Sequence, residues 1–262
     1  MSSFENKVVV VTGGSNGIGR CLTRTFASLG ADVAFMDIDS EAGEKNLAVL
    51  KGMGCNALFY HGDAADKAAL EGFAAAIGKT YGRADILVNN ACKGLGGILS
   101  GCSYEDFDYV LRLGVAAPYW LTKLLLPLFG KDAAVINISS TRAEMSQADT
   151  ESYTAAKGGI SALTHGLAMS LAGKVRVNGI APGWIDVGAY HDESYVPSYT
   201  EADLLQHPSG RVGDPTDIAR AVVFLASLEN GFINGQIITV DGGMTKKMIY
   251  AGDEGWELSV SD

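Results

Sequence analysis

The sequence predicts an α/β fold: a doubly wound parallel β-sheet of about seven strands, flanked by helices on both faces, in one domain spanning residues 1–262. Two observations predict it. Apolar, strand-like runs recur along the chain and alternate with stretches in which apolar residues follow the 3.6-residue period of a helix. The first run, residues 8–11, consists only of valine, which is typical of a strand buried on both faces.

The expected strands span residues 7–12, 31–37, 56–63, 84–91, 133–140, 174–183 and 235–243. Helical spacing of apolar side chains predicts helices over residues 17–29, 41–52, 66–80, 152–171 and 215–228. Residues 113–129 predict a further, buried helix. Pro118, Lys123 and Pro127 interrupt its apolar run, so the segment does not resemble a membrane span.

Two regions depart from this alternation. Residues 184–212 lack sustained periodicity and are long for a connection, which predicts a substrate loop or lid. The C-terminal tail, residues 244–262, keeps Ile249, Tyr250 and Trp256 and is too apolar for a simple frayed end.

The composition excludes several classes of partner. A formal net charge of −10 opposes binding to nucleic acid or to an anionic membrane. The four cysteines lack metal-ligand spacing and the N-terminus lacks the apolar core of a signal peptide. We therefore expect free thiols, no metal site and a reducing, cytoplasmic location.

A glycine-rich turn follows the first strand, in the pattern T-G-x-x-x-G-x-G that begins at Thr12. Glycines allow a pyrophosphate to approach the free N–H groups and partial positive charge of a helix N-terminus. The turn therefore predicts a dinucleotide site, although a tight strand-to-helix turn without a ligand remains an alternative.

The second strand ends at Asp37, eighteen residues after Gly19, where a carboxylate can accept hydrogen bonds from ribose hydroxyls. No arginine or lysine stands at Asn16 or at residues 38–40 to bind a 2′-phosphate. The sequence thus predicts NAD(H) in preference to NADP(H). Capping of the helix that starts near Ser40 is the alternative role for Asp37.

A second group of residues suggests acid–base chemistry. Tyr153 and Lys157 are one helical turn apart and share a face. A lysine ammonium beside a phenol favours the phenolate, so the tyrosine can exchange a proton with an alcohol or a carbonyl. Ser140, at the end of a strand, is placed to bind the substrate oxygen. Tyrosine and lysine at this spacing also occur on ordinary helices.

Together, TGGSNGIG, NNAC at residues 89–92, Ser140 thirteen residues before Tyr153, Y-x-x-x-K and the Pro182–Gly183 pair resemble the short-chain dehydrogenase/reductase superfamily, from residue 7 to about 243. The resemblance implies a Rossmann-type domain, nicotinamide-dependent interconversion of alcohols and ketones, and a dimer or tetramer. It implies that Ser140, Tyr153 and Lys157 are the catalytic serine, the acid–base tyrosine and the supporting lysine.

The resemblance also implies a cofactor site. Asp63 would contact the adenine amine, unless it only caps its strand, and the backbone of Ile185 would meet the carboxamide. Asn89 would steady the central strands, whereas Asn90 is interpreted as structural. The full set of implied cofactor contacts is Gly13, Ser15, Asn16, Gly17, Ile18, Gly19, Asp37, Ile38, Asp63, Ala64, Asn89, Ala91, Tyr153, Lys157, Pro182, Gly183 and Ile185.

Three positions depart from the family pattern. Gly114 stands where the family often has an asparagine that holds a relay water, and we expect water to fill the space it leaves. Cys92 replaces a glycine near the nicotinamide and is interpreted as a small buried residue or a reactive thiol. Val187 replaces a threonine on the nicotinamide side.

Substrate contacts are expected from Cys92, Arg142, Trp184 and Tyr190, with His191 and Tyr195 in the same aromatic wall. Arg142 could bind a carboxylate or a hydroxyl-rich substrate, or pair internally with Glu144 or Asp149. A sugar or polyol, a hydroxysteroid and a 3-oxoacyl compound are the candidate substrates.

These observations favour an NAD(H)-dependent dehydrogenase acting on a secondary alcohol or its ketone. The alternative is a nucleotide-binding regulatory or scaffold protein with weak turnover, which only Gly114 supports. Apolar helix faces near residues 105–129 and 152–171 predict a homotetramer or homodimer.

Overall fold

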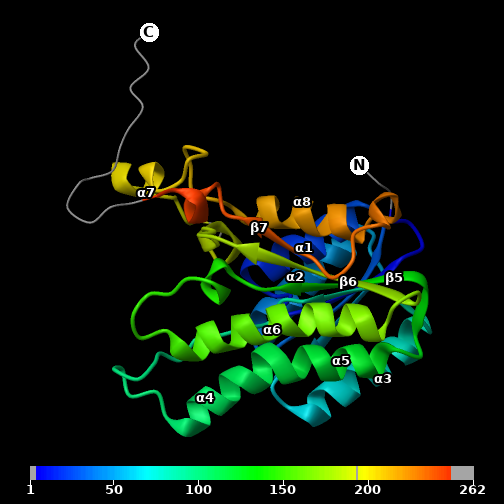
Figure 1. The fold of residues 1–262 in the computed structure, drawn as a ribbon. Helices are drawn as coiled ribbons and strands as arrows, with labels where there is room; N and C mark the ends of the chain where they lie inside the picture. Colours follow the sequence, from blue (N-terminus) through cyan, green and yellow to red (C-terminus); the bar gives the residue numbers. More distant parts are fainter. Residues whose placement is uncertain (1–3, 193, 249–262) are drawn as a thin grey trace.

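The computed structural model describes residues 4–192 and 194–248 and contains one parallel sheet of seven strands in the order β3-β2-β1-β4-β5-β6-β7 (Figure 1). The predicted α/β class and the seven strands are confirmed. Ile249, Tyr250 and Trp256 of the tail lie outside the described residues. The strands are β1 (Val8–Thr12), β2 (Asp32–Asp37), β3 (Ala57–His61), β4 (Ala84–Asn89), β5 (Phe129–Ile138), β6 (Val175–Pro182) and β7 (Ile237–Val240).

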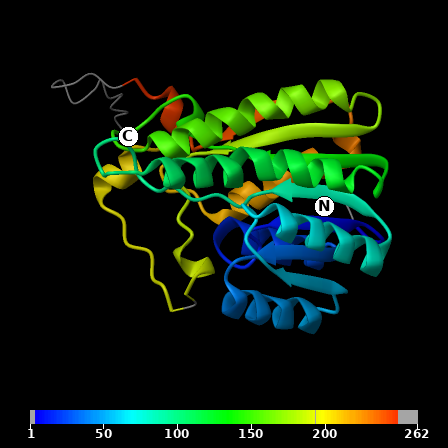
Figure 2. The same cartoon turned by 90° about the horizontal axis from the view of Figure 1, so that it is seen from below.

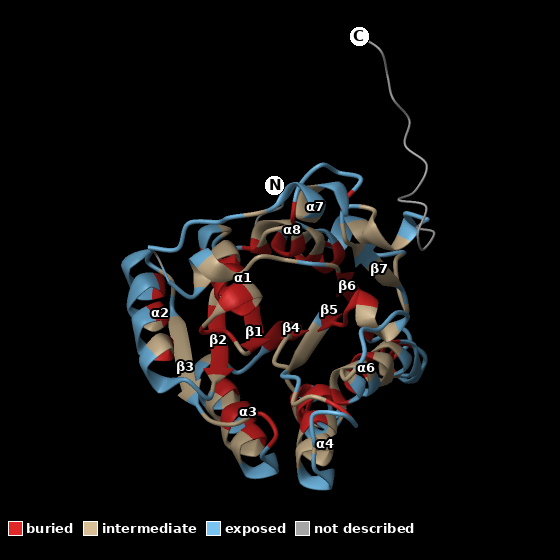
Figure 3. Cartoon of the chain, turned by 90° about the vertical axis from the view of Figure 1, so that its left-hand side faces the viewer, coloured by how far each residue is buried: buried red, intermediate tan, exposed pale blue. Residues whose placement is uncertain are grey.

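Helices cover both faces of the sheet, and buried residues concentrate between the layers (Figure 3). One face carries α1 (Gly17–Ser28), α2 (Ser40–Gly52) and α8 (Pro215–Ala226). The other carries α3 (Lys67–Tyr81), α4 (Tyr104–Leu111), α5 (Ala117–Leu125) and α6 (Glu151–Ser170). Figure 2 shows α3, the α4–α5 run and α6 side by side across this second face.

The valines of β1 explain how one sheet supports two cores. Successive side chains of a strand point to opposite faces. Val9 and Val11 pack into the cluster under α1 and α8, and Val10 packs into the cluster under α3 and α5. All three are fully buried, so the apolar run at residues 8–11 is satisfied on both sides.

The buried helix expected over residues 113–129 is only partly correct. The helical run is interrupted by a π-helical turn at Arg112–Ala116, and α5 ends at Leu125 because β5 already begins at Phe129. In addition, one face of α5 is exposed to solvent: Tyr119 is 47% exposed. Periodicity alone could not reveal a π turn, since one extra residue in a turn leaves the apolar pattern almost unchanged.

The strand order reverses between β1 and β4: the strands that follow β1 in the chain add on one side, and those that follow β4 add on the other. In open α/β sheets, ligands bind at the carboxyl edge of the sheet, beside such a reversal. The loop of residues 184–212 follows β6 at this edge and contains two short helical segments, Gly188–Tyr190 (η3) and α7 (Glu201–Leu205). Within the described residues, no helix is both long and apolar enough to cross a bilayer.

Candidate active site

The glycine turn after β1 is shaped so that only glycine fits at its key positions. Gly13 and Gly17 have φ values of 67° and 53°, in the left-handed region that side chains disfavour. A Cβ on Gly19 would lie 1.8 Å from the carbonyl oxygen of Gly13. The first turn of α1 therefore packs directly against the backbone of Gly13, at the end of β1.

Residues from β1 and β4 hold this turn in place. The Asn90 amide donates to the carbonyl oxygens of Thr12 and Gly13, each at 3.0 Å. The Thr12 hydroxyl accepts from the N–H groups of Asn90 and Ala91. The structural interpretation of Asn90 is thus confirmed.

The turn fits a phosphate group. The Ser15 hydroxyl is buried and has no hydrogen-bond partner within the described residues, although a buried hydroxyl is normally paired. Asn16, which precedes α1, makes no side-chain cap, so the first N–H groups of that helix remain available. A bound pyrophosphate would satisfy both the hydroxyl and the helix N-terminus.

Asp37 lies at the end of β2, beside the turn. Its Oδ2 accepts from the N–H of Ser15 at 2.9 Å, and its Oδ1 accepts from the N–H of Asp39 at 3.0 Å. The alternative that Asp37 caps the next helix is wrong, because Asp39 is the N-cap of α2 and accepts from the N–H of Ala42. Ile38, between the two carboxylates, is 62% exposed.

Arg20 approaches the turn from α1 but is directed into the protein. Its Nε donates to the Ser15 carbonyl at 2.7 Å and its Nη2 donates to the Asn16 side chain at 3.2 Å. The residue is only 7% exposed. The guanidinium of Arg20 thus bonds to the turn itself, while the carboxylates of Asp37 and Asp39 follow β2 beside it.

Among the remaining implied cofactor contacts, Asn89 and Asp63 make hydrogen bonds that link neighbouring elements of the fold. The Asn89 amide donates to Asn137 Oδ1 at 2.8 Å, tying β4 to β5, while its own Oδ1 is buried without a partner within the described residues. Asp63 accepts from the Ala65 N–H and the Tyr109 hydroxyl, so its carboxylate holds the turn after β3 and links it to α4. Ala64, next to it, is buried.

The segment after β6 completes this groove. The Gly183 N–H donates to the Val240 carbonyl, and a Cβ on Gly183 would lie 2.6 Å from Asp241 Cβ. Ile185 forms an isolated parallel bridge with Gly213, yet its own N–H and C=O make no hydrogen bond within the described residues. Both groups are therefore available to a carboxamide.

The catalytic candidates converge on α6 and the end of β5. Lys157 is 3% exposed, its Nζ donates to the Ile138 carbonyl at 2.7 Å, and the same atom lies 5.3 Å from the centre of the Tyr153 ring. The Ser140 Oγ accepts from the Arg142 N–H at 3.1 Å. A buried lysine side chain is thus held beside the Tyr153 ring, at the end of β5.

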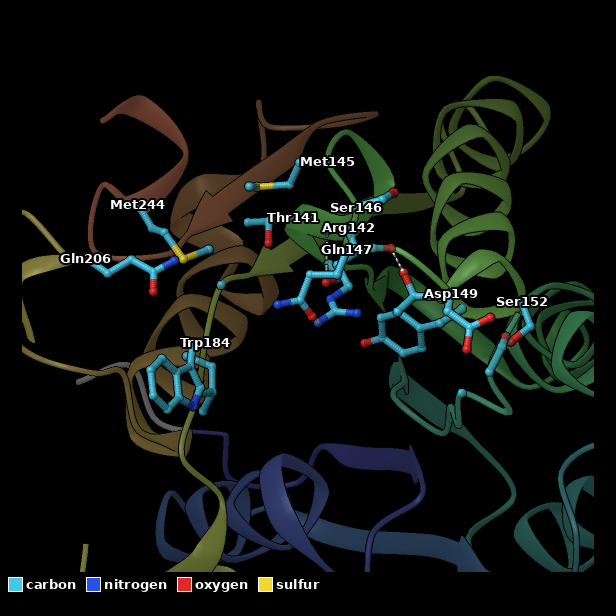
Figure 4. A pocket seen from close by; sticks show the side chains of 17 residues that line it. Thr141, Arg142, Met145, Ser146, Gln147, Asp149, Ser152, Trp184, Gln206 and Met244 are labelled. Carbon is cyan, nitrogen blue, oxygen red and sulfur yellow. Dashed lines mark hydrogen bonds between the residues drawn. The ribbon is translucent and has the colours of Figure 1, made fainter. Parts of the chain in front are cut away.

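Ser140 and Tyr153 open into a cavity of about 820 Å³ (Figure 4). Of the four expected substrate residues, the cavity is lined by Arg142 and Trp184 but not by Cys92 or Tyr190. Its wall is completed by residues from five separate segments of the chain: Gly94, Gly96, Thr141, Met145, Ser146, Gln147, Asp149, Thr150, Ser152, Gly183, Ile185, Gln206 and Met244.

The expectations for Cys92 and Tyr190 as cavity walls are therefore wrong. Tyr190 packs on the α1 side of the sheet beside Cys21, and burial raises its pKa to about 12, helped by the Cys21 thiol. Cys92 is half-buried, and its Sγ faces Gly114. His191 and Val187 also lie elsewhere, within 3.5 Å of the position of a Cβ on Gly17.

A carboxylate holds the 184–212 loop together. Asp186 accepts from the hydroxyls of Tyr199 and Tyr195 at 2.6 and 2.8 Å and from the Gly188 N–H at 2.9 Å. Partial burial works to raise the pKa of Asp186, but these hydrogen bonds outweigh it and the pKa is lowered. Trp184 packs edge-on against Tyr199, with ring centres 6.3 Å apart.

The space expected at Gly114 is not open. A Cβ there would lie 2.8 Å from the Ala156 Cβ and 3.5 Å from the Cys92 Sγ. The π turn brings the backbone of Gly114 close against α6, so a glycine is required by packing. The expectation that a missing side chain leaves room for water is wrong at the Cβ position.

Gln206 and Met244 are cavity residues that the sequence did not reveal. They follow α7 and β7, about sixty and a hundred positions after Ser140, and neither belongs to a motif. Only the lack of periodicity in the 184–212 lid indicated that this region would reach the site.

Comparisons with known proteins agree with this geometry. Residues 13–245 match the family model described as enoyl-(acyl carrier protein) reductase. An uncharacterised oxidoreductase of Thermotoga maritima is 41% identical over 253 residues, which cover 94% of this chain and 99% of that protein. The 7alpha-hydroxysteroid dehydrogenase of Escherichia coli is 34% identical over 249 residues, covering 94% of this chain and 96% of that one.

Solved structures are similar throughout their length. An apo SCOR enzyme from Clostridium thermocellum has 45% sequence identity and a TM-score of 0.85, covering 98% of this chain and 100% of its own. A short-chain dehydrogenase from Burkholderia cenocepacia in complex with NADP has 28% identity and a TM-score of 0.85, covering 93% of this chain and 100% of its own.

Proposed function

Because the chain belongs to the short-chain dehydrogenase/reductase superfamily, we propose that it is an NAD(H)-dependent dehydrogenase that interconverts a secondary alcohol and its ketone. The observation that carries the proposal is the buried Lys157 ammonium beside the Tyr153 ring, at the wall of a cavity that also exposes Ser140. Three groups suited to binding and protonating a carbonyl oxygen thus lie around one space.

Each residue has a distinct task in this proposal. Ser140 binds the substrate oxygen, and Tyr153 gives a proton to it during reduction or removes one during oxidation. Lys157 stabilises the tyrosinate left behind, and its anchoring to the Ile138 carbonyl keeps it from drifting into the cavity. The nicotinamide, when bound, exchanges a hydride with the substrate carbon.

The preference for NAD(H) is supported by Asp37 and Asp39. A 2′-phosphate would meet two carboxylates there, while ribose hydroxyls could donate to Asp37. The relative from Burkholderia cenocepacia was solved with NADP, so family membership alone does not decide between the cofactors. The preference rests on these two side chains.

Assembly and location are part of the proposal as well. Tyr104, Tyr119 and Met169 are exposed on α4, α5 and α6, which supports a homotetramer or homodimer formed through these helices. Light scattering that gave only a monomer mass at micromolar concentration would refute it. The cysteines within the described residues are free, which supports a reducing, cytoplasmic compartment.

The proposed activity is tested by following NADH and NADPH oxidation in parallel over a panel of sugar, steroid and 3-oxoacyl ketones. We expect at least one ketone to be reduced with NADH and to be reduced much more slowly with NADPH. Tight NADH binding without turnover of any ketone would favour a regulatory nucleotide-binding protein instead.

A further inference from the structure

The substrate cavity contains one cation whose role the proposed chemistry leaves open. Among the described residues that line the cavity, Arg142 alone carries a positive charge, and it shares the wall with Ser140 and Tyr153. Its side chain projects into the middle of the space, next to Gln147 (Figure 4). The protein has a net charge of −10, yet its cavity contains a positive charge to which the proposed acid–base chemistry gives no task.

The carboxylates that could neutralise Arg142 are turned to other partners. Asp149 accepts from the N–H groups of Leu99 and Ser100 at 2.8 and 2.9 Å. Glu151 accepts from the N–H of Ile98 at 3.2 Å. Both acids therefore order the loop at residues 98–100.

Arg142 itself has only neutral partners. Its Nη2 donates to the amide oxygen of Gln147, and within the described part of the chain no carboxylate lies within ion-pair distance of its guanidinium. The internal pairing with Glu144 or Asp149 considered from the sequence is thus absent. The remaining N–H groups of the guanidinium can serve a ligand.

The backbone fixes where this charge lies relative to the reaction. The Arg142 N–H donates to the Ser140 Oγ, and Thr141–Ala143 form a short 3-10 turn at the end of β5. The guanidinium therefore starts two residues from the side chain that binds the substrate oxygen. A planar guanidinium binds a carboxylate through two parallel hydrogen bonds, which orients the bound molecule as well as attracting it.

We propose that Arg142 binds a carboxylate on the substrate, so that the substrates of this enzyme are oxo acids and the corresponding hydroxy acids. The inference rests on the proposed dehydrogenase function and adds the substrate class. Gln147, hydrogen-bonded to Arg142, acts as a positioning residue that holds the guanidinium in the cavity.

The test compares each acid with its neutral ester. The probes are pyruvate, acetoacetate and levulinate, which place the carboxylate at increasing distance from the ketone, and their methyl esters. With NADH, we expect at least one acid to have a kcat/KM about tenfold or more above that of its ester, the advantage of one charge-assisted hydrogen bond.

Substitution identifies the residue responsible. Arg142→Gln should remove this advantage of about tenfold by raising the KM for the acid, and should change the kcat/KM of the ester by no more than about twofold. Arg142→Lys should restore part of the advantage of the acid over its ester. Arg220→Gln is the matched control. Arg220 is exposed on α8, so this substitution removes the same charge outside the cavity. It should leave the acid-to-ester ratio unchanged.

A binding measurement separates this inference from the dehydrogenase proposal. Calorimetry measures the three acids against the protein saturated with NAD⁺, and we expect binding in the unmodified protein that Arg142→Gln abolishes. Such binding, without turnover of any probe or of any ketone in the wider panel, would support the carboxylate site and contradict the dehydrogenase. Equal use of acids and esters would overturn the carboxylate site alone, as would the absence of acid binding.

Discussion

The Nζ of Lys157 lies 5.3 Å from the centre of the Tyr153 ring and donates a 2.7 Å hydrogen bond to the carbonyl of Ile138. The lysine is therefore hydrogen-bonded to the end of β5 and lies beside the tyrosine that we propose as the acid–base group. It is 3% exposed, so water screens its charge poorly.

Lys157→Ala should therefore lower kcat by at least about a hundredfold, the scale of a general acid–base contribution. NADH affinity should fall as well, because we place the same ammonium against the nicotinamide ribose. Stopped-flow kinetics and fluorescence titration measure the two effects. Lys174→Ala, in the exposed segment after α6, is the control. A Lys157→Ala enzyme with normal kcat would exclude the lysine from the chemistry.

Asp37 should determine the cofactor preference. NADH is expected to bind at least about tenfold more tightly than NADPH, since the 2′-phosphate meets repulsion and loses the ribose hydrogen bonds. Asp37→Ser should reduce the ratio of the two affinities, because it weakens the binding of NADH and removes the repulsion of the 2′-phosphate of NADPH. Asp32→Asn removes one charge from the other end of β2 and should leave the ratio as it is. Equal affinities in the unmodified protein would contradict the assignment.

Gly114 should tolerate no side chain. Gly114→Asn places a Cβ 2.8 Å from the Ala156 Cβ, and overpacking of this kind costs about 1–3 kcal/mol of unfolding free energy. Adding Ala156→Gly should recover part of the loss. Gly166→Ala is the matched comparison, because nothing lies within 4 Å of its Cβ position on α6, and it should stabilise by about 0.5–1 kcal/mol. Denaturant unfolding measures all of these, and a fully stable Gly114→Asn protein would show that the helices can separate.

The lid should loosen in acid. The pKa of Asp186 is lowered in the folded 184–212 loop, so the stabilisation that its carboxylate gives the loop is complete above the ordinary pKa of 3.8 and is lost as the pH falls through the lowered value. Burial and the hydrogen bond to Asp186 raise the pKa of Tyr199 to about 12. The hydrogen bond from the Tyr199 hydroxyl to Asp186 therefore stabilises the loop fully below the ordinary tyrosine pKa of 10.0, and this stabilisation is lost as the pH rises toward 12.

Hydrogen exchange of amides in residues 184–212, corrected for the intrinsic pH dependence, measures this loosening. Asp186→Asn should show the loose state already at pH 7. Asp192→Asn should not, because among the described residues the Asp192 carboxylate accepts only from Ser194, in its own loop. Unchanged protection in Asp186→Asn would show that Trp184 packing, and not the carboxylate, holds the lid.

How far the sequence predicts this site depends on how local each feature is. The position of Asp37 follows from one strand and one turn, so spacing sufficed. The environment of Arg142 depends on Asp149 bonding to the loop at residues 98–100, which are far from it in sequence, so an ion pair could not be excluded. Tyr190 was misplaced because an aperiodic loop does not reveal which of its aromatic residues faces the core.

The central claim is that Tyr153 is the acid–base group of a nicotinamide-dependent dehydrogenase, and single-turnover oxidation of NADH tests it most directly. With a ketone that the unmodified protein reduces, Tyr153→Phe should lower the rate by at least about a hundredfold and leave the NADH dissociation constant within about twofold. Tyr104→Phe, at an 80% exposed tyrosine, should match the unmodified protein in both measurements. A Tyr153→Phe protein that oxidises NADH at the unmodified rate would contradict the account.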